Sequence, residues 1–183
     1  MTLNKFDNHY VDALEKKWIY MVIAFLLLSW SVIIYYAAVK NIHPPSNVEV
    51  IDSARLHIDS GIGGGEFRED KLGVHQDAQG NLVVTMVAAR YGFYPQKITV
   101  PVNTPIKFRM ASFDVLHGVH IPFSNMNTMI IPGYVTDLTT EFQKVGEYPL
   151  ICDEYCGVGH ATMYGMITIV PKESFHLSSG EHS

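Results

Sequence analysis

The chain is poor in cysteine and in positive charge. Its 183 residues include two cysteines, Cys152 and Cys156, so no framework of several disulfides can hold the fold together. Lys and Arg number 13 against 18 Asp and Glu, which gives a formal net charge of −5. A phosphate-binding surface needs clustered Lys and Arg, so this balance argues against a nucleic-acid partner. The length allows one domain of ordinary size and an appendage.

An uncharged apolar run extends from Trp18 to Val39. A helix rises about 1.5 Å per residue, so this run would span roughly 30 Å, the thickness of a bilayer hydrocarbon core. Aromatic residues lie toward both ends, as in interfacial belts. A cleaved signal peptide would have a shorter apolar region and a small-residue cleavage site, which the residues after Val39 do not supply. We therefore expect residues 18–39 to be an uncleaved transmembrane anchor.

Basic residues near this run set its expected orientation. Lys5, Lys16 and Lys17 precede the run, whereas Lys40 stands alone just after it. Positive charge favours the cytoplasmic side. We therefore expect a cytoplasmic lead-in at residues 1–17 and a large domain on the outer (periplasmic) side of a bacterial or archaeal cell membrane.

The segment at residues 40–79 is acidic and contains His43-Pro44-Pro45 and Gly63-Gly64-Gly65. Such a composition resists regular secondary structure. We interpret the segment as a solvated connector; the alternative is an acidic surface that helps to dock a basic partner.

A pattern of short strands begins near residue 80. Turn residues separate segments that are rich in β-branched residues or that alternate in polarity, at 82–88, 96–100, 106–110, 134–142, 146–152 and 166–170. Several short strands at this spacing indicate a β-sandwich or barrel. We expect this domain to occupy residues 80–171 and a polar tail to follow at 172–183.

The loop from Cys152 to Met163 carries the most informative chemistry. It contains two thiols, the imidazole of His160 and a thioether. Soft sulfur ligands together with imidazole favour copper over hard cations. Two thiolates on one loop can bridge two metal ions, which then need a second imidazole, and the upstream stretch from Ser112 to His120, which contains His117 and His120, supplies one. These residues indicate a dinuclear copper site for electron transfer.

Other interpretations of this loop remain open. Two cysteines outside the cytoplasm can form a disulfide, although a ring as short as Cys-x3-Cys would add only local stiffness. Zinc could take both cysteines with His117 and His160 as a tetrahedral set, but it has no use for Met163. A methionine next to a strand is also commonly a core residue.

Four sequence blocks carry a family resemblance. They are DVLHGVH at 114–120, IPG at 131–133, GEY at 146–148 and CDEYCGVGHATMYG at 152–165. Together they resemble subunit II of the haem-copper cytochrome c oxidases, which carries the CuA centre. The resemblance covers roughly residues 80–170. It implies an all-β cupredoxin-like Greek-key sandwich or barrel, preceded here by one N-terminal transmembrane helix.

The resemblance also implies the ligands of two copper ions. Cys152 and Cys156 would bridge the ions, and His117 and His160 would each bind one of them. The axial ligands would be the sulfur of Met163 and the backbone carbonyl of Glu154. The Glu154 side chain would in addition bind a magnesium ion shared with subunit I.

The function implied is that of a subunit of a respiratory terminal oxidase. It would accept electrons from cytochrome c or a small copper protein and pass them to haem in subunit I. There oxygen is reduced to water and protons are translocated. The chain has no haem-binding set of its own, so it would not be catalytic alone. Two alternatives keep the copper: a subunit of a membrane nitric oxide reductase, and a membrane-tethered copper carrier.

The chain departs from the commonest family pattern in two ways. It has one apolar run instead of two, and the stretch at 88–95 lacks the tryptophans of many relatives. Both departures resemble the B-type oxidases. Tyr91 and Phe93 are our candidates for the surface where electrons enter, with ordinary packing as the alternative.

Two polar residues of the His117 block need separate interpretation. Asp114 could orient the imidazole of His117, because metal-bound histidines generally donate their other N–H to an acceptor. It could equally stabilise a turn. We expect His120 to be a structural histidine and not a copper ligand.

Overall fold

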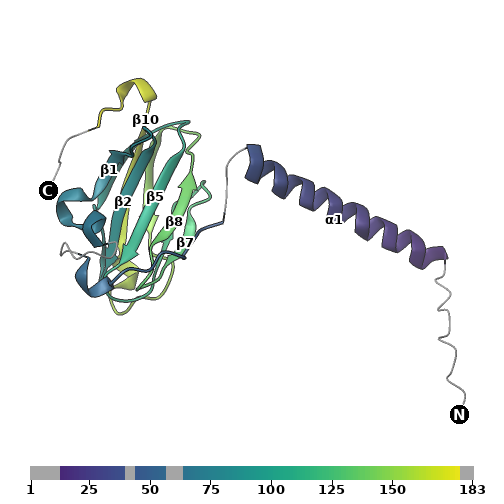
Figure 1. Ribbon diagram of the computed structural model, residues 1–183, viewed down its shortest axis with the longest axis horizontal. Helices are drawn as coiled ribbons and strands as arrows, with labels where there is room; N and C mark the ends of the chain where they lie inside the picture. Colours follow the sequence, from purple (N-terminus) through teal and green to yellow (C-terminus); the bar gives the residue numbers. More distant parts are fainter. Residues whose placement is uncertain (1–12, 40–43, 57–63, 178–183) are drawn as a thin grey trace, which may run out of the picture. The chain divides into compact units, whose positions relative to one another are not determined.

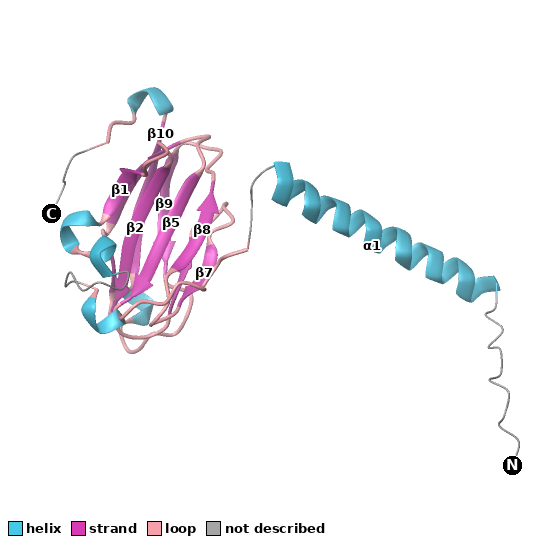
Figure 2. Ribbon diagram, viewed as in Figure 1, coloured by secondary structure: helices cyan, strands magenta, loops and turns pink. Residues whose placement is uncertain are grey.

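The structure is a computed structural model that describes residues 13–39, 44–56 and 64–177. The chain divides into two compact units, Met1–Ile42 and His43–Ser183. In the first unit, helix α1 runs over Ala13–Val39 (Figures 1 and 2), and among the described residues it is the one helix long and apolar enough to cross a membrane. From Trp18 onward its side chains carry no charge and are mostly apolar on all sides, which suits a lipid environment. The helix begins before the expected residue 18, because Ala13–Lys17 are good helix formers. Residues 1–12 of the expected lead-in lie outside the described part.

The second unit is a β-sandwich (Figure 2). In the described part of the chain, two five-stranded sheets form it. The first has the order β1–β2–β5–β8, with β3 also paired to β2: β1 Gly73–Gln76, β2 Leu82–Ala89, β3 Gly92–Tyr94, β5 Ile106–Ser112 and β8 Thr136–Thr140. The second has the order β4–β10–β9–β6–β7: β4 Lys97–Pro101, β6 His117–His120, β7 Asn127–Ile130, β9 Gly146–Ile151 and β10 Tyr164–Val170.

Short 3₁₀ turns complete the described fold, at Ser53–Arg55, Gly64–Phe67, Glu69–Lys71, His160–Thr162 and Lys172–Ser174. All six predicted strands are present within a few residues of their expected bounds. Four strands of three or four residues, β1, β3, β6 and β7, were not predicted, since so short a run shows no clear alternation.

Strand β2 is buried along almost its whole length. One of its faces belongs to the main core between the two sheets, where Val84 and Met86 pack. Val87, on its other face, packs in a second cluster with Ile51, Leu56 and Phe67. A strand that is covered on both faces is expected to have a nearly continuous apolar sequence. The sequence of β2, LVVTMVAA, fits this expectation.

The prediction of a solvated connector at residues 40–79 is therefore wrong for much of that segment. Ile51, Leu56 and Phe67 are buried against the outer face of the first sheet. Ser46 and Val50 form isolated β-bridges to the chain near β8, and strand β1 lies within the same segment. Its apolar residues are spaced too irregularly to show a period in the sequence. Residues 40–43 and 57–63 lie outside the described part.

Arg109 on β5 forms ion pairs with acidic residues of the segment at residues 40–79. Its guanidinium contacts Glu66 at 2.5 and 2.8 Å, Glu49 at 2.8 Å and Asp137 at 3.1 Å. Hydrogen bonds to Glu66 outweigh burial and raise the pKa of Arg109 above its ordinary value, so the group stays charged. Two acids of the segment at residues 40–79, Glu49 and Glu66, therefore help to hold the fold together; an acidic docking surface was the alternative interpretation of this segment.

The tail expected at 172–183 is described as far as residue 177. Within that part, Phe175 is half-buried against the main core. Residues 178–183 lie outside the described part.

We expect Arg109→Met to lower the free energy of unfolding of the β-unit by about 2–3 kcal/mol, because three carboxylates would face one another without their shared cation. The Arg109 side chain is only 16% exposed, so water screens it weakly. The matched control is Lys107→Met: Lys107 pairs with Asp137 alone at 3.0 Å and is 43% exposed, so its loss should cost less than about 1 kcal/mol. Urea unfolding of the full chain in detergent, followed by circular dichroism, measures both. Equal losses in the two variants would contradict the role given to Arg109.

Candidate metal centre

Two loops bring the candidate ligands together. The β5–β6 loop ends at His117, the first residue of β6. The second loop runs from Cys152, just after β9, to Met163, just before β10. Because β9 and β10 pair antiparallel, the ends of this second loop lie side by side, and Cys152 N donates to Met163 O at 3.3 Å. Sheet pairing therefore fixes both ends of the loop.

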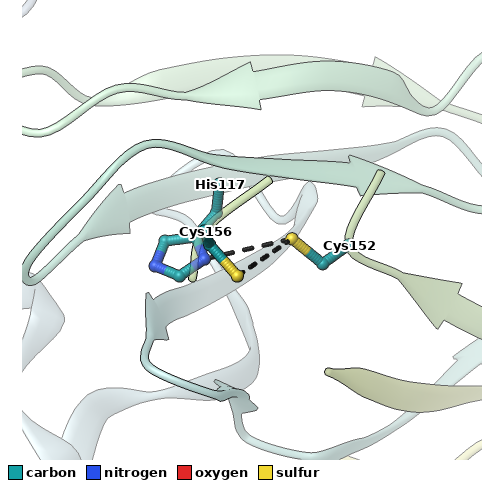
Figure 3. A group of neighbouring side chains, drawn as sticks. All are labelled: His117, Cys152 and Cys156. Atoms are coloured by element: carbon teal, nitrogen blue, oxygen red, sulfur yellow. Dashed lines mark hydrogen bonds between the residues drawn. The ribbon is translucent and has the colours of Figure 1, made fainter. Parts of the chain in front are cut away.

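Three of the candidate ligand side chains meet where the two loops come together (Figure 3). The Sγ atoms of Cys152 and Cys156 are 3.8 Å apart, and Nδ1 of His117 lies 4.0 Å from Cys152 Sγ. These three ligand atoms all lie within 4.8 Å of one another. A disulfide needs an S–S distance of about 2.05 Å, so the two thiols are free in this structure and are spaced as metal ligands would be.

The remaining candidate ligands divide between the two sulfur atoms. His160 Nδ1 lies 3.8 Å from Cys156 Sγ, and Met163 Sδ lies 3.6 Å from the same atom. The backbone oxygen of Glu154 lies 3.2 Å from Cys152 Sγ. Each sulfur therefore has one imidazole nitrogen and one weaker donor close to it. The four other predicted ligands therefore all lie within 4.0 Å of one of the two cysteine sulfur atoms.

The centre of the group is closed to water. Exposure is 0% for His117, 2% for Met163, 4% for Cys152 and 5% for Cys156. Burial, with a hydrogen bond and a charge interaction from Cys152, raises the pKa of the Cys156 thiol to about 11. The thiol therefore holds its proton until a cation displaces it, which makes metal binding and proton release a single event.

Asp114 holds the imidazole of His117 in one orientation. Nε2 of His117 donates to Asp114 Oδ1 at 2.9 Å, which leaves the Nδ1 lone pair directed at the sulfur pair. Burial raises the pKa of Asp114, but hydrogen bonds from His117 and from Arg90 outweigh it and lower the value to about 2. Asp114 also accepts the backbone N–H of Val115 at 2.7 Å. Asp114 thus makes the contacts that both interpretations require, one to the imidazole of His117 and one to a backbone N–H of its own turn.

Glycine lets β6 and the ligand loop approach closely. A Cβ on Gly118 would overlap the side chain of Asp153 and lie 2.8 Å from the backbone nitrogen of Glu154. Only a residue without a side chain fits at this crossing. The contact brings the strand that carries His117 against the start of the loop that carries the cysteines.

The two aromatic candidates for electron uptake differ. Phe93 is 1% exposed and belongs to the main core, so the prediction that it forms a surface is wrong. An aromatic residue in a short strand gives no sequence signal of which face it occupies. Tyr91 is half-buried, and its surface role stays a prediction.

Sequence reasoning missed two exposed apolar residues of the ligand loop. Tyr155 is 72% exposed and Val158 is 93% exposed. The Tyr155 ring lies 5.8 Å, between centroids, from that of His160. Apolar residues placed between metal ligands were the signal that could have identified them. His120 lies outside the ligand group, as expected; among the described residues its Nδ1 is buried and finds no hydrogen-bond partner.

Comparison with known proteins gives concordant matches. A family model described as the periplasmic domain of cytochrome c oxidase subunit II matches residues 85–170. A cytochrome c oxidase subunit 2 from Thermus thermophilus is 32% identical over 163 residues, 88% of this chain and 93% of the relative. A second one from Thermus thermophilus is 38% identical over 109 residues, 60% of this chain and 79% of the relative.

A solved structure is similar over nearly the same length. It is a cryo-EM structure of a heme-copper terminal oxidase dimer, one chain of which aligns with a TM-score of 0.64 and 29% identity. The alignment covers 86% of this chain and 99% of the other. The predicted fold class, an all-β cupredoxin-like domain with one N-terminal apolar helix, is confirmed.

We expect Asp114→Ala to weaken the binding of a thiophilic metal by about 10- to 100-fold, because the imidazole of His117 would lose its orienting acceptor. Competition with a chromophoric chelator, using Cu(I), measures this affinity. Asp77→Ala is the control: Asp77 accepts the backbone N–H groups of Gln79 and Asn81 in another turn and should leave the affinity unchanged. An Asp114→Ala variant with parental affinity would contradict the orienting role.

Proposed function

The chain belongs to the family of cytochrome c oxidase subunit II, through which electrons enter haem-copper oxidases, and we propose that they enter here at a dinuclear copper centre. One observation carries the proposal. Two free, buried thiols lie 3.8 Å apart, and each has a different imidazole nitrogen beside it. A single tetrahedral zinc would need both imidazoles to converge on one point. A pair of sulfur-bridged ions uses them separately.

Six residues would hold the two ions. Cys152 and Cys156 would supply two thiolates, and His117 and His160 would supply one Nδ1 each. The thioether of Met163 and the carbonyl of Glu154 would supply two weaker donors. When bound, two sulfur-bridged copper ions share one unpaired electron, so the change of charge at each ion is small.

The chain itself keeps the ligands in place during electron transfer. The β9–β10 ladder pins Cys152 and Met163, and His160 N donates to Gly157 O at 3.0 Å inside the loop. Asp114 holds the imidazole of His117 and places a negative charge beside the centre. A site that is rigid in this way needs little rearrangement when its charge changes, which favours fast transfer.

We propose that the partners follow the family pattern. The donor is cytochrome c or a small copper protein, and the acceptor is haem in subunit I. The exposed Tyr155 and Val158, which lie among the ligands, suit contact with such a protein. We propose that α1 spans the membrane once, with Lys16 and Lys17 on the cytoplasmic side and the copper domain on the outer side. The presence of one such helix among the described residues also supports assignment to the B-type oxidases.

Two other functions have less support. A copper carrier needs an exposed and exchangeable site, whereas four of the six ligand residues here are at most 5% exposed. A nitric oxide reductase subunit could hold the same centre, but the relatives found are subunits of cytochrome c oxidase.

We expect Cys156→Ser to bind at most one copper ion per chain, because a hydroxyl is a poor bridging ligand. In the assembled oxidase, stopped-flow reduction of the haem of subunit I by the reduced donor should slow by at least about tenfold, since an increase of about 1.4 kcal/mol in a barrier already gives that factor. Thr162→Ser is the control: it keeps the hydroxyl that bonds Gly159 O at 2.9 Å in the same loop. Unchanged copper content and unchanged haem reduction in Cys156→Ser would contradict the proposal.

We also propose that the Glu154 side chain binds a magnesium ion shared with subunit I. Its carboxylate is a hard oxygen ligand of the kind that Mg²⁺ prefers, and it is half-buried beside the centre. We expect Glu154→Gln, in the assembled oxidase, to lose most of its magnesium, or of manganese substituted for it, while its copper content stays complete. Metal analysis measures the magnesium and copper contents, and electron paramagnetic resonance detects the bound manganese. A Glu154→Gln variant that keeps all of its magnesium would contradict the magnesium role and would leave the proposed copper centre unaffected.

A further inference from the structure

The turn between β2 and β3 contacts the loop that carries His117. Strand β2 ends at Ala89 and β3 begins at Gly92, so the turn consists of Arg90 and Tyr91. Arg90 donates to Asp114 Oδ2 twice, from its backbone N at 2.9 Å and from Nε at 3.1 Å. The other oxygen of the same carboxylate accepts from His117 Nε2. One carboxylate therefore links the turn to the first imidazole.

The next residue of the turn contacts the other ligand loop. A Cβ built on Gly159 would lie 2.8 Å from Cε2 of Tyr91 and closer still to Cδ2 and Cγ, so the glycine faces the plane of the ring. A Cβ built on Gly157 would lie 2.7 Å from the Tyr91 hydroxyl oxygen. The ring of Tyr91 therefore extends along the loop from Gly159 to Gly157.

The contact with Tyr91 explains why residue 159 is a glycine, although its backbone conformation does not require one. Gly159 has φ −91° and ψ 7°, values that many residues adopt. Gly157, in contrast, has φ 129°, a conformation that favours glycine. At Gly159 the space taken by the Tyr91 ring is what excludes a side chain.

A shift of the backbone from Gly157 to Gly159 would also shift the imidazole of His160. His160 N donates to Gly157 O at 3.0 Å, and Thr162 donates to Gly159 O from its backbone N at 3.0 Å and its Oγ1 at 2.9 Å. These bonds shape the 3₁₀ turn that carries His160. A ring packed against Gly157 and Gly159 therefore sets where Nδ1 of His160 lies relative to Cys156.

We propose that the Arg90–Tyr91 turn positions the ligands of both loops at once. Arg90 acts through Asp114 on His117, and Tyr91 acts through the glycine backbone on His160. Tyr91 is then a positioning residue of the centre. The inference rests on the proposed copper centre, and it goes beyond it by naming residues that hold the two halves of the ligand set in register.

Copper release from the full chain in detergent tests the inference. We expect Tyr91→Ala to release copper to a chelator at least about tenfold faster than the parent and to alter the copper hyperfine splitting, since loss of supporting contacts commonly costs 10- to 100-fold in metal affinity. Tyr91→Phe keeps the ring and should behave as the parent does. Tyr94→Ala is the matched control, because Tyr94 lies in the same hairpin but its ring is near Gly92.

A second substitution tests the contact from the other side. Gly159→Ala adds a methyl group where the ring lies, without backbone strain, and should also speed copper release. In the Tyr91→Ala background the same methyl group enters vacated space and should add little. Such non-additivity identifies a direct contact. If Tyr91→Ala folds poorly, the Gly159→Ala variant alone still tests the contact.

Three results would overturn the inference. One is that Tyr91→Ala and Gly159→Ala both release copper within about twofold of the parent, with unchanged hyperfine splitting. Another is that the two substitutions are additive. The third is that Tyr91→Ala slows reduction by the donor but leaves copper release unchanged, which would assign Tyr91 to electron uptake alone. A parent chain that itself fails to bind two copper ions would instead overturn the copper centre on which the inference rests.

Discussion

The pairing of β9 with β10 is the constraint on which the metal centre depends. The two strands are registered from Gly146 opposite Ile169 to Ile151 opposite Tyr164. The bond from Cys152 N to Met163 O continues this contact by one step. The ligand loop is thereby closed at its base, and its ends cannot separate without breaking a sheet whose side chains form the core. Metal geometry is thus coupled to the stability of the whole β-unit.

The second requirement is that His117 comes within reach of this loop. Strand β6 pairs with β9 only at His120 and Ile151, and the backbone crossing at Gly118 brings the strand close to Glu154. Asp114 then selects which imidazole nitrogen faces the sulfur atoms. Burial at the centre raises the pKa of the Cys156 thiol, so a cation that binds there both completes the site and removes that proton.

The sequence predicted which side chains of the ligand loop come together, because cysteine, histidine and methionine at short spacing are a local signal. The six longer strands were also predictable from β-branched content and turns. The ligand role of His117 beside this loop came from the family resemblance, since periodicity does not report which strands become neighbours. The outer layer around Ile51, Leu56 and Phe67 was missed because those residues are buried singly, without a period. The burial of Phe93 and the packing of Tyr91 on the loop depend on tertiary contacts of a short hairpin, which no local pattern encodes.

The most direct test of the account is electron paramagnetic resonance of the full chain after loading with copper, together with the copper content per chain. The account predicts two copper ions and a spectrum in which one unpaired electron is split equally by two copper nuclei. A single copper ion with the splitting of one nucleus, or a folded chain that takes up zinc in preference to copper, would contradict it.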